Sequence, residues 1–417
     1  MWKHVNEDFW KQNRASKVGE VDEAVAGIVN TVRKDGDKAL FELTKKFDRQ
    51  DLKSLEVTRE EIEDAYERLD PDLTDELENA AFSIQRFHEM QVPPDIWYRE
   101  VEPGITLGMK STPLSSVGCY VPGGRAAYPS TVLMCVIPAK VAGVERVICC
   151  TPPPVNPATL VAADIAGADA VYKVGGAQAI AAMALGTESI RKVDKIVGPG
   201  NVFVTSAKMM LRNEVEIDFP AGPSEIGVLA DSTAVPKFVA ADLIAQAEHD
   251  PSSASLLVTD DPDLPDTVWE IVEKMAANQP RKEIIFKALE NSGYIIAEDM
   301  DLAIDIMNGI APEHLSVQTS DPMDTLSKVR NAGSIFVGPY TPVAAGDYAS
   351  GTNHVLPTAG NSAVASGLGV SHFRKTSTVQ ILTKEGLETL APTIEVISES
   401  EGLHAHGDSV RVRLNGE

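Results

Sequence analysis

The chain has 417 residues, of which 43% are hydrophobic and 24% are charged, as is typical of a soluble globular enzyme with about two main domains. Its 37 lysines and arginines against 61 aspartates and glutamates give a net charge of −24, which argues against nucleic acid or an anionic membrane as a partner. No apolar run reaches the ~18–20 residues needed to span a bilayer, and the polar start of the sequence lacks the apolar core of a signal peptide.

The first 98 residues are rich in charge and carry helical periodicity. Residues 1–15 are polar and amphipathic, which predicts a short helical arm. Farther on, four apolar side chains fall at i, i+3, i+4 and i+7 and therefore share one face of a helix, namely Val25, Ile28, Val29 and Val32. Two prolines at 93 and 94 end this region, and from residue 99 the alternation of β-branched residues is typical of strands.

The middle third of the chain alternates short apolar strands with helices of small residues. Strands are predicted within 144–153, 170–175 and 195–201, and the helices between and after them at 158–167, 177–186 and 202–213. Repeated strand–turn–helix units of this kind indicate a parallel sheet that is covered on both faces.

A second alternating block begins with the apolar strand at 226–230. It continues through 253–264, a long helix near 264–277, and strands within 292–299 and 333–338. We therefore predict an α/β protein with two Rossmann-like, doubly wound domains. The last 45 residues mix strand, helix and charged turns, which predicts a small α+β appendage beside the N-terminal helical one.

Three turns rich in glycine directly follow predicted strands, at 120–130, 174–179 and 197–201. None matches the dinucleotide fingerprint or the phosphate-binding P-loop, so each turn alone could simply connect a strand to a helix. Glycines at strand ends also let a ligand approach the backbone, and the helix N-termini beyond them favour phosphate. Together, and with three polar or aromatic side chains, the turns favour a nucleotide-like ligand. Those side chains are Tyr120, Gln178 and Asn201.

The stretch 218–250 carries a second group of candidates. A turn with Ser224 leads into the strand at 226–230, and the following helix ends with Gln246 and His249. Residues at i and i+3 share one helix face, so this amide and this imidazole could hold a metal ion or a polar ligand together. The alternative is a solvated histidine beside the C-terminal end of the helix dipole.

Histidine is scarce, with eight in the chain, yet several histidines lie in loops between apolar strands. Glu313 and His314 follow a proline and offer a carboxylate and an imidazole, which suits general base catalysis. Asp347 precedes His354 by seven residues, and His406 lies in a late charged turn. Each histidine alone is more often structural than catalytic, and spacing cannot show that these residues converge. The pattern predicts a site for a metal or a polyol on an α/β protein that binds a nucleotide.

Eight segments in order along almost the whole chain resemble the histidinol dehydrogenase family. They are GCYVPGGRAAYPSTVLM, VGGAQAIAAMALGT, KIVGPGNVFV, DFPAGPSE, IAQAEHD, APEHL, AGDYASGTNHVLPT and EGLHAH. The resemblance implies a zinc-dependent, NAD-linked oxidoreductase of histidine biosynthesis. Such enzymes oxidise L-histidinol to L-histidinal and then to L-histidine, and they use two NAD per turnover.

The resemblance also implies roles for individual residues. The zinc ligands would be Gln246, His249, Asp347 and His406, the last from the partner subunit of a homodimer. Glu313 and His314 would be the catalytic acid/base pair, and NAD would contact Tyr120, Gln178 and Asn201. The substrate would be held by Ser224, Gln246, His249, His314, Asp347, His354, Glu401 and His406, with Glu401 opposite its amine.

The same resemblance implies a division into domains. Residues 1–15 would form the arm, and residues 16–98 with 224–368 a larger discontinuous domain that carries most metal and catalytic residues. Residues 99–223 would bind NAD, and residues 369–417 would be an appendage that contributes to the partner's site. The stretch 360–377 departs from the usual wording of the family. His372 and His404 have no assigned role, and we expect both to be solvated.

Three alternatives stay open at this point. A related zinc/NAD dehydrogenase for another small polar alcohol would keep the metal ligands but would not need Glu401 opposite an amine. A thiol-based aldehyde dehydrogenase would use Cys119. A non-catalytic metal- or nucleotide-binding protein would leave the Glu313–His314 pair without a role.

The four cysteines, Cys119, Cys135, Cys149 and Cys150, fit no zinc-finger or disulfide pattern, so we expect a reducing cytoplasm as the place of action.

Overall fold

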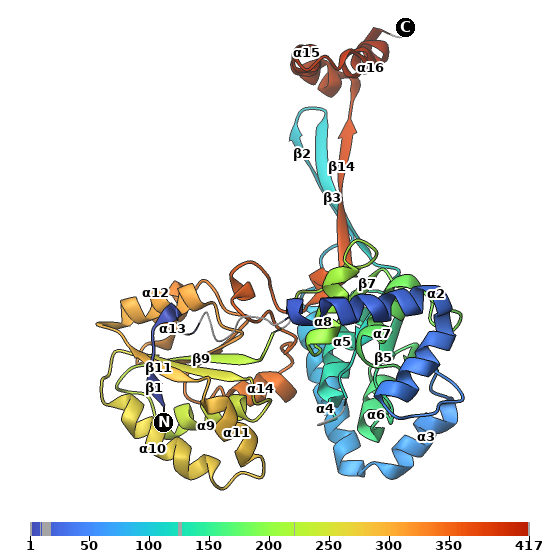
Figure 1. The fold of residues 1–417 in the computed structure, drawn as a ribbon. Coiled ribbons are helices and arrows are strands. Elements are labelled where there is room, and N and C mark those ends of the chain that lie inside the picture. Colours follow the sequence, from blue (N-terminus) through green and yellow to red (C-terminus); the bar gives the residue numbers. More distant parts are fainter. Residues whose placement is uncertain (1, 9, 11–17, 124–126, 221, 416–417) are drawn as a thin grey trace. The chain divides into compact units, whose positions relative to one another are not determined.

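The computed structural model describes residues 2–8, 10, 18–123, 127–220 and 222–415. The chain forms two compact units, residues 1–91 with 115–373 and residues 92–114 with 374–417 (Figure 1). None of the helices in the described part combines the length and the apolar character that crossing a bilayer requires.

The first unit contains a five-stranded parallel sheet in the middle third of the chain. Its order is β6-β5-β4-β7-β8, which is 3-2-1-4-5 when the strands are numbered along the chain, the order of a Rossmann fold. The strands are β4 (Ser116–Tyr120), β5 (Arg146–Cys150), β6 (Ala170–Tyr172), β7 (Lys195–Val197) and β8 (Glu216–Ile217). The connecting helices are α5 (Pro129–Val141), α6 (Pro157–Ile165), α7 (Gly176–Leu185) and α8 (Val202–Met210). The predicted parallel sheet is confirmed.

The helices of the N-terminal region pack with this five-stranded sheet. They are α2 (Asp22–Phe47), α3 (Arg59–Arg68) and α4 (Pro71–Glu89), preceded by the 3-10 helix η1 (Val18–Val21). Val25, Val29 and Val32 of the predicted apolar face are buried in one cluster with α7 and α8, and Ile28 packs against it. Helices α3 and α4 contact α5 and α6. This packing differs from the predicted grouping of residues 16–98 with 224–368, because the small side chains of α7 provide the surface that accepts α2.

The second sheet of the first unit has six parallel strands in the order β1-β11-β10-β9-β12-β13. Without β1 this is again 3-2-1-4-5, so the second doubly wound sheet is also confirmed. The strands are β1 (Lys3–His4), β9 (Glu225–Ala230), β10 (Ala254–Thr259), β11 (Gly293–Ile296), β12 (His314–Gln318) and β13 (Ser334–Val337). The helices are α9 (Pro236–Ala247), α10 (Leu264–Ala276), α11 (Lys282–Leu289), α12 (Met300–Ile310), α13 (Pro322–Lys328) and α14 (Val343–Tyr348), followed by the 3-10 turns η2 (Asn361–Ala363) and η3 (Val370–Phe373).

The predicted helical arm at 1–15 begins differently from expectation. Its first residues form β1, which pairs with β11, and Trp2 stacks on Trp269 and contacts Tyr294. An apolar side chain next to an open sheet edge therefore outweighs the weak helical pattern. Residues 7, 8 and 10 of the arm are helical, as predicted, and residues 1, 9 and 11–15 lie outside the described residues.

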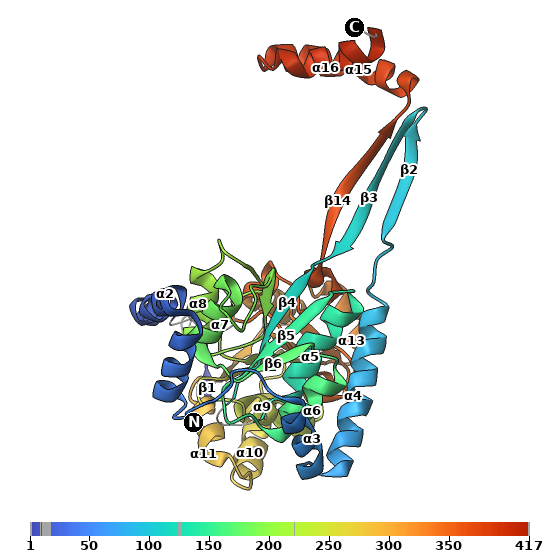
Figure 2. The same cartoon turned by 90° about the vertical axis from the view of Figure 1, so that its right-hand side faces the viewer.

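The second unit is a three-stranded antiparallel sheet with two helices (Figure 2). Strand β3 (Ile105–Pro113) lies between β2 (Ile96–Glu102) and β14 (Arg374–Leu382), and helices α15 (Lys384–Ser400) and α16 (His404–Asn415) pack on each other. The unit leaves large apolar side chains exposed, among them Trp97 at 46% and Val396 at 70%. Its boundaries fall after residues 91, 114 and 373, whereas the sequence placed them after 98 and 368.

Candidate active site

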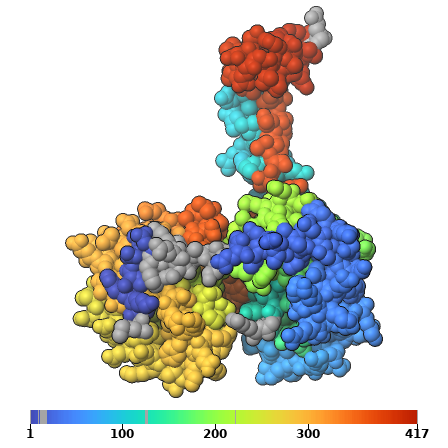
Figure 3. Space-filling model, viewed as in Figure 1, coloured from blue at the N-terminus to red at the C-terminus, as the bar shows by residue number. Residues whose placement is uncertain are grey.

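The first unit contains a pocket with a cavity volume of about 1650 Å³. It is lined by strand ends of both sheets, carboxyl ends from one sheet and amino ends from the other. The five-stranded sheet contributes the carboxyl ends of β4 and β7, the usual location of a ligand in such folds. The six-stranded sheet contributes its amino ends, with Ser224 before β9, Ser253 before β10 and Glu313 before β12. The first unit is hollowed between these two halves (Figure 3). The volume exceeds that of most single-ligand pockets and leaves room for a dinucleotide beside a small substrate.

The glycine turn after β7 is held from two sides. Gly198 has a φ of 110°, and a β-carbon there would meet the carbonyl oxygen of Tyr120, so glycine is required. The Gly198 N–H donates to Asp218 (2.8 Å), and Lys208 Nζ donates to the Gly198 carbonyl (3.0 Å). Lys208 and Asp218 also form a buried ion pair. The turn is therefore rigid before any ligand arrives.

Two of the three residues predicted to contact NAD line the pocket. Tyr120 ends β4, and its hydroxyl accepts a hydrogen bond from the Gly176 N–H (3.0 Å). Asn201 caps α8, since its Oδ1 accepts from the N–H groups of the second and third residues after it. Gln178 is buried on α7 and is not among the described lining residues. Part of the turn at 120–130 falls on residues 124–126, outside the described residues.

The predicted acid/base pair lies at the amino end of β12, beside a second carboxylate. His314 Nε2 is 3.7 Å from Asp347 Oδ1, and His314 Nδ1 is 3.5 Å from Glu313 Oε2. Burial opposes a charge on the ring, but Glu313 and Asp347 outweigh it and raise the pKa of His314 to about 10. The structure thus brings Glu313, His314 and Asp347 together, although they come from two separate segments.

The main chain of Glu225 orients this pair. Glu313 Oε2 accepts from the Glu225 N–H (2.9 Å), and His314 Nδ1 lies 3.2 Å from the Glu225 carbonyl oxygen. The sequence placed Glu225 in the turn before the strand at 226–230, whereas it is the first residue of β9. No local pattern signals that its backbone would hold two residues of a distant segment.

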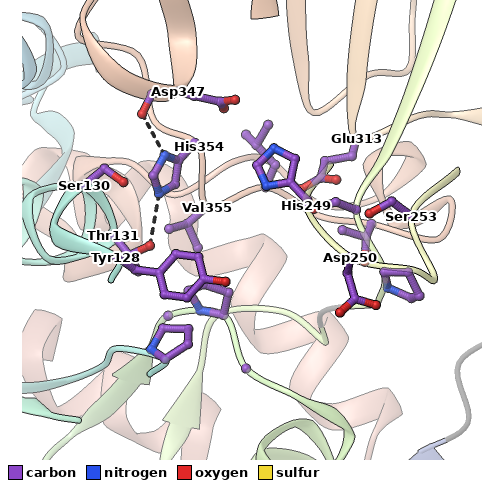
Figure 4. Close-up of a pocket in the computed structure, with 18 of the residues that line it drawn as sticks. Tyr128, Ser130, Thr131, His249, Asp250, Ser253, Glu313, Asp347, His354 and Val355 are labelled. Carbon is purple, nitrogen blue, oxygen red and sulfur yellow. Dashed lines mark hydrogen bonds between the residues drawn. The ribbon is translucent and has the colours of Figure 1, made fainter. Parts of the chain in front are cut away.

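His354 has one defined tautomer. Its Nδ1 lies 2.9 Å from the carbonyl oxygen of Asp347 and its Nε2 lies 3.3 Å from Thr131 Oγ1 (Figure 4). A carbonyl only accepts, so Nδ1 carries the hydrogen and Nε2 accepts from the threonine hydroxyl. Burial lowers the pKa of His354, which keeps the ring neutral. Thr131, at the start of α5, was not identified from the sequence.

The amide of Gln246 is buried near the end of α9. The side chain is 1% exposed, and neither its Oε1 nor its Nε2 has a hydrogen-bond partner among the described residues. Such a buried, unpaired amide is costly unless another group binds it. His249 follows α9 and faces the same hollow as Asp347 (Figure 4), while its carbonyl accepts from Arg281 (3.3 Å).

These three side chains fit part of a metal site. Amide, imidazole and carboxylate donors suit zinc. Among the described residues no three or more His, Cys, Asp or Glu side chains are grouped so as to hold a metal ion. Of the four residues predicted as ligands, Gln246, His249 and Asp347 belong to the first unit and His406 belongs to the second.

The remaining predicted residues are divided between the two units. Ser224, in the first unit, lines the pocket. Glu401 ends α15 and His406 lies in the first turn of α16, both exposed in the second unit. His404 is exposed, as expected, and pairs with Glu399 (2.9 Å). His372 is instead partly buried, because it packs edge-on against Phe219 and accepts from the Gly369 N–H (3.2 Å).

Cys119 is a poor candidate nucleophile. The side chain is fully buried in β4, and burial raises the pKa of its thiol well above the usual value. A reactive cysteine needs access and a stabilised thiolate, and this residue has neither. The structure therefore argues against a thiol-based aldehyde dehydrogenase.

The paired Rossmann-like sheets and the buried histidine between two carboxylates are the features of an α/β oxidoreductase. The profile of the family "Histidinol dehydrogenase" matches residues 11–414. Histidinol dehydrogenase from Methanosarcina mazei is 53% identical over 96% of this chain and 94% of its own, and that from Methanothermobacter thermautotrophicus is 54% identical over 95% and 94%. The crystal structure of histidinol dehydrogenase from Elizabethkingia anophelis has a TM-score of 0.95 at 40% identity and covers 99% of this chain and 97% of that chain. The chain belongs to the histidinol dehydrogenase family and is an oxidoreductase.

Proposed function

We propose that the enzyme oxidises L-histidinol through L-histidinal to L-histidine, with two NAD and one zinc ion per subunit, and that residues 99–223 bind the NAD. The observation that carries the proposal is the buried His314, flanked by Glu313 and Asp347 in the pocket. His249, three residues after the buried Gln246, lines the same pocket. The family membership supports the same reaction.

The metal ligands in this proposal are Gln246, His249 and Asp347, together with His406 of the partner subunit. Zinc held by these residues would bind the amine and the imidazole of the substrate and so orient it for hydride transfer to NAD. Ser224, His354 and Glu401 complete the substrate contacts, with the carboxylate of Glu401 opposite the amine.

Proton transfer is assigned to His314 and Glu313. Each oxidation removes a hydride from carbon and a proton from oxygen, and His314 accepts that proton. Glu313 and Asp347 raise the pKa of His314, so a cation bound to Asp347 would lower that pKa toward the range of a general base. Glu313 activates the water that hydrates the aldehyde, which makes the second hydride transfer possible.

NAD binding is assigned to the half of the pocket formed by β4 and β7. Tyr120 and Asn201 line it, and Gln178 lies on the neighbouring helix α7. The rigid turn at Gly198 lets a ligand come close to the backbone.

A homodimer with shared sites explains the second unit. Its sheet and helices expose Trp97, Val101, Val396 and Ile397, more apolar surface than such a small unit would leave to water. A partner that covers this surface would also receive Glu401 and His406. All four cysteines are free and buried, which fits action in a reducing cytoplasm.

The test is the amount of NADH formed per L-histidinol, with and without a chelator. Two NADH per substrate, lost on chelation and restored by zinc, is the expected result. Activity only with a carboxylated or sulfonated diol would instead assign the chain to another small polar alcohol. No NADH with any alcohol would refute the proposal altogether.

A further inference from the structure

Asp242 is a buried carboxylate that no step of the proposed reaction uses. It lies on α9, one turn before Gln246, and is 5% exposed. Its Oδ2 accepts from Ser316 Oγ (3.1 Å), and its carboxylate also accepts from the Val343 N–H. A carboxylate away from water is costly unless it is well hydrogen-bonded, so its position calls for a reason.

The direction of the bond to Ser316 is set by a third residue. Gln318 Nε2 donates to Ser316 Oγ (3.1 Å), so the serine hydroxyl points its own hydrogen at Asp242. Ser316 and Gln318 are both buried on β12. The chain Gln318–Ser316–Asp242 therefore fixes one point of α9 against one point of β12.

The bond to Val343 fixes a third element at the same point. Val343 is the first residue of α14, and the residue before it is Pro342, which offers no side-chain cap. Asp242 thus supplies from α9 the cap that the sequence of α14 lacks. Asp242 joins α9, β12 and α14.

Each of these three elements also carries a residue of the site, close along the chain to the residue that joins this network. Gln246 is four residues after Asp242 and Asp347 is four residues after Val343, which is about 6 Å along either helix. His314 is two residues before Ser316, about 6.6 Å along β12 and on the same face of the sheet. Helices α9 and α14 run opposite to the strands. Going from Asp242, Val343 and Ser316 to the three site residues therefore leads in each case toward the amino ends of the strands. The short separation of His314 from Asp347, 3.7 Å, agrees with this register.

We propose that Asp242 is a positioning residue that sets the register of α9, β12 and α14, and so brings Gln246, His314 and Asp347 to one place. The inference rests on the proposed function only in calling that place a zinc site. Partners behind a first set of ligands commonly change metal affinity by about 10–100-fold when they are replaced.

The test compares Asp242→Asn and Ser316→Ala with a matched control, Asp299→Asn. Asp299 is an exposed N-cap of α12 in the same unit, and its side chain accepts from the Leu302 N–H (2.8 Å). The control therefore makes the same Asp-to-Asn change at a helix N-cap, where asparagine also accepts, and its hydrogen bond lies within α12. Urea unfolding of each variant shows whether the losses of stability are comparable.

Two measurements are made on the full-length protein. The first is zinc affinity, from competition with a chromophoric chelator and from the visible spectrum of the cobalt-loaded enzyme. Asp242→Asn is expected to weaken zinc binding about 10–100-fold and to alter the cobalt spectrum, and Ser316→Ala to have a smaller effect. Asp299→Asn should stay within about twofold of the unaltered enzyme.

The second measurement is amide hydrogen exchange of the metal-free protein. Residues 343–348 should exchange at least tenfold faster in Asp242→Asn but not in Asp299→Asn. If the unaltered chain binds no zinc, the proposed metal site fails and the exchange alone decides the positioning role. Unchanged exchange in α14, or unchanged zinc affinity in a protein that binds zinc, would overturn the inference.

Discussion

The two sheets of the first unit share a strand order, but they contribute opposite ends of their strands to the pocket. At the carboxyl edge of the five-stranded sheet, helices begin: α5 and α8 bring Pro129 and Asn201 to the lining. At the amino edge of the six-stranded sheet, helices end: α9 and α14 bring His249 and Asp347. Helix N-termini favour anions and helix C-termini favour cations. The half of the pocket beside the five-stranded sheet thus suits the pyrophosphate of a dinucleotide, and we call it the anion half. The half beside the six-stranded sheet suits a metal ion and an amine, and we call it the cation half.

The largest expected effect is that of His314→Gln in the cation half. Loss of a general base typically costs about 10²–10⁴-fold in kcat. Because the anion half is untouched, the KM for NAD should stay within about twofold. Steady-state kinetics with L-histidinol and NAD measures both values. A kcat within tenfold of the unaltered enzyme would remove His314 from the proposed mechanism.

Gln246→Leu tests whether the buried amide is a ligand. The leucine fills a similar volume without polar atoms, so the variant should fold at least as well, since two unpaired polar atoms disappear. Zinc affinity should fall at least tenfold, as measured by chelator competition, while NAD affinity from fluorescence titration stays the same. Undiminished zinc binding would show that Gln246 has another role.

Gly198→Ala tests the anion half, with Gly338→Ala as its control. Both glycines have a positive φ, 110° and 87°, so both substitutions strain the backbone by about 1 kcal/mol. Only at Gly198 does the new β-carbon meet another group, since nothing lies within 4 Å at Gly338. The KM for NAD should rise about tenfold in Gly198→Ala alone, with zinc content unchanged in both. Equal KM values in the two variants would contradict the assignment of this turn to NAD.

The smallest effect concerns Asp48, the C-cap of α2 beside the five-stranded sheet. Its Oδ2 is buried and has no hydrogen-bond partner in the described part of the chain, and burial raises the pKa of Asp48 from 3.8 to about 6. The folded chain therefore holds this proton more tightly than the unfolded chain, and the resulting stability is full below pH 3.8 and lost as the pH rises through 6. Asp48→Asn should stabilise the protein by about 1 kcal/mol at pH 8, after allowance for partial exposure, and by nothing at pH 3.5. Urea unfolding at the two pH values measures this difference.

The sequence predicted those features that depend on local pattern. The alternation of short apolar strands with small-residue helices was sufficient for both parallel sheets, and the apolar face of Val25, Val29 and Val32 was correct. The sheet that α2 joins was predicted wrongly, because an apolar helix face does not specify its partner. The pairing of β3 with β14 was not predicted, since two strands far apart in sequence carry no local signal for each other.

The site shows the same division. Residues with chemically distinctive side chains, such as Gln246, His249 and the Glu313–His314 pair, could be named from motifs. The residues that orient them could not: Glu225 acts through its backbone, Thr131 is an ordinary helix residue, and Asp242 shows its role only when three elements are assembled around it. The sequence also could not predict that the amino ends of the strands of the second sheet line the pocket, because periodicity does not say which end of a strand faces a ligand.

The central position of β3 in the second unit has a consequence for synthesis on the ribosome. Strands β2 and β3 are made early, but the strand that pairs with the other side of β3 emerges only after residues 114–373. An isolated two-stranded hairpin is at best marginally stable in water. The hairpin must therefore stay unpaired on one edge while residues 115–373 of the first unit are translated. A chain that stops before β14 would keep that edge open to other strands.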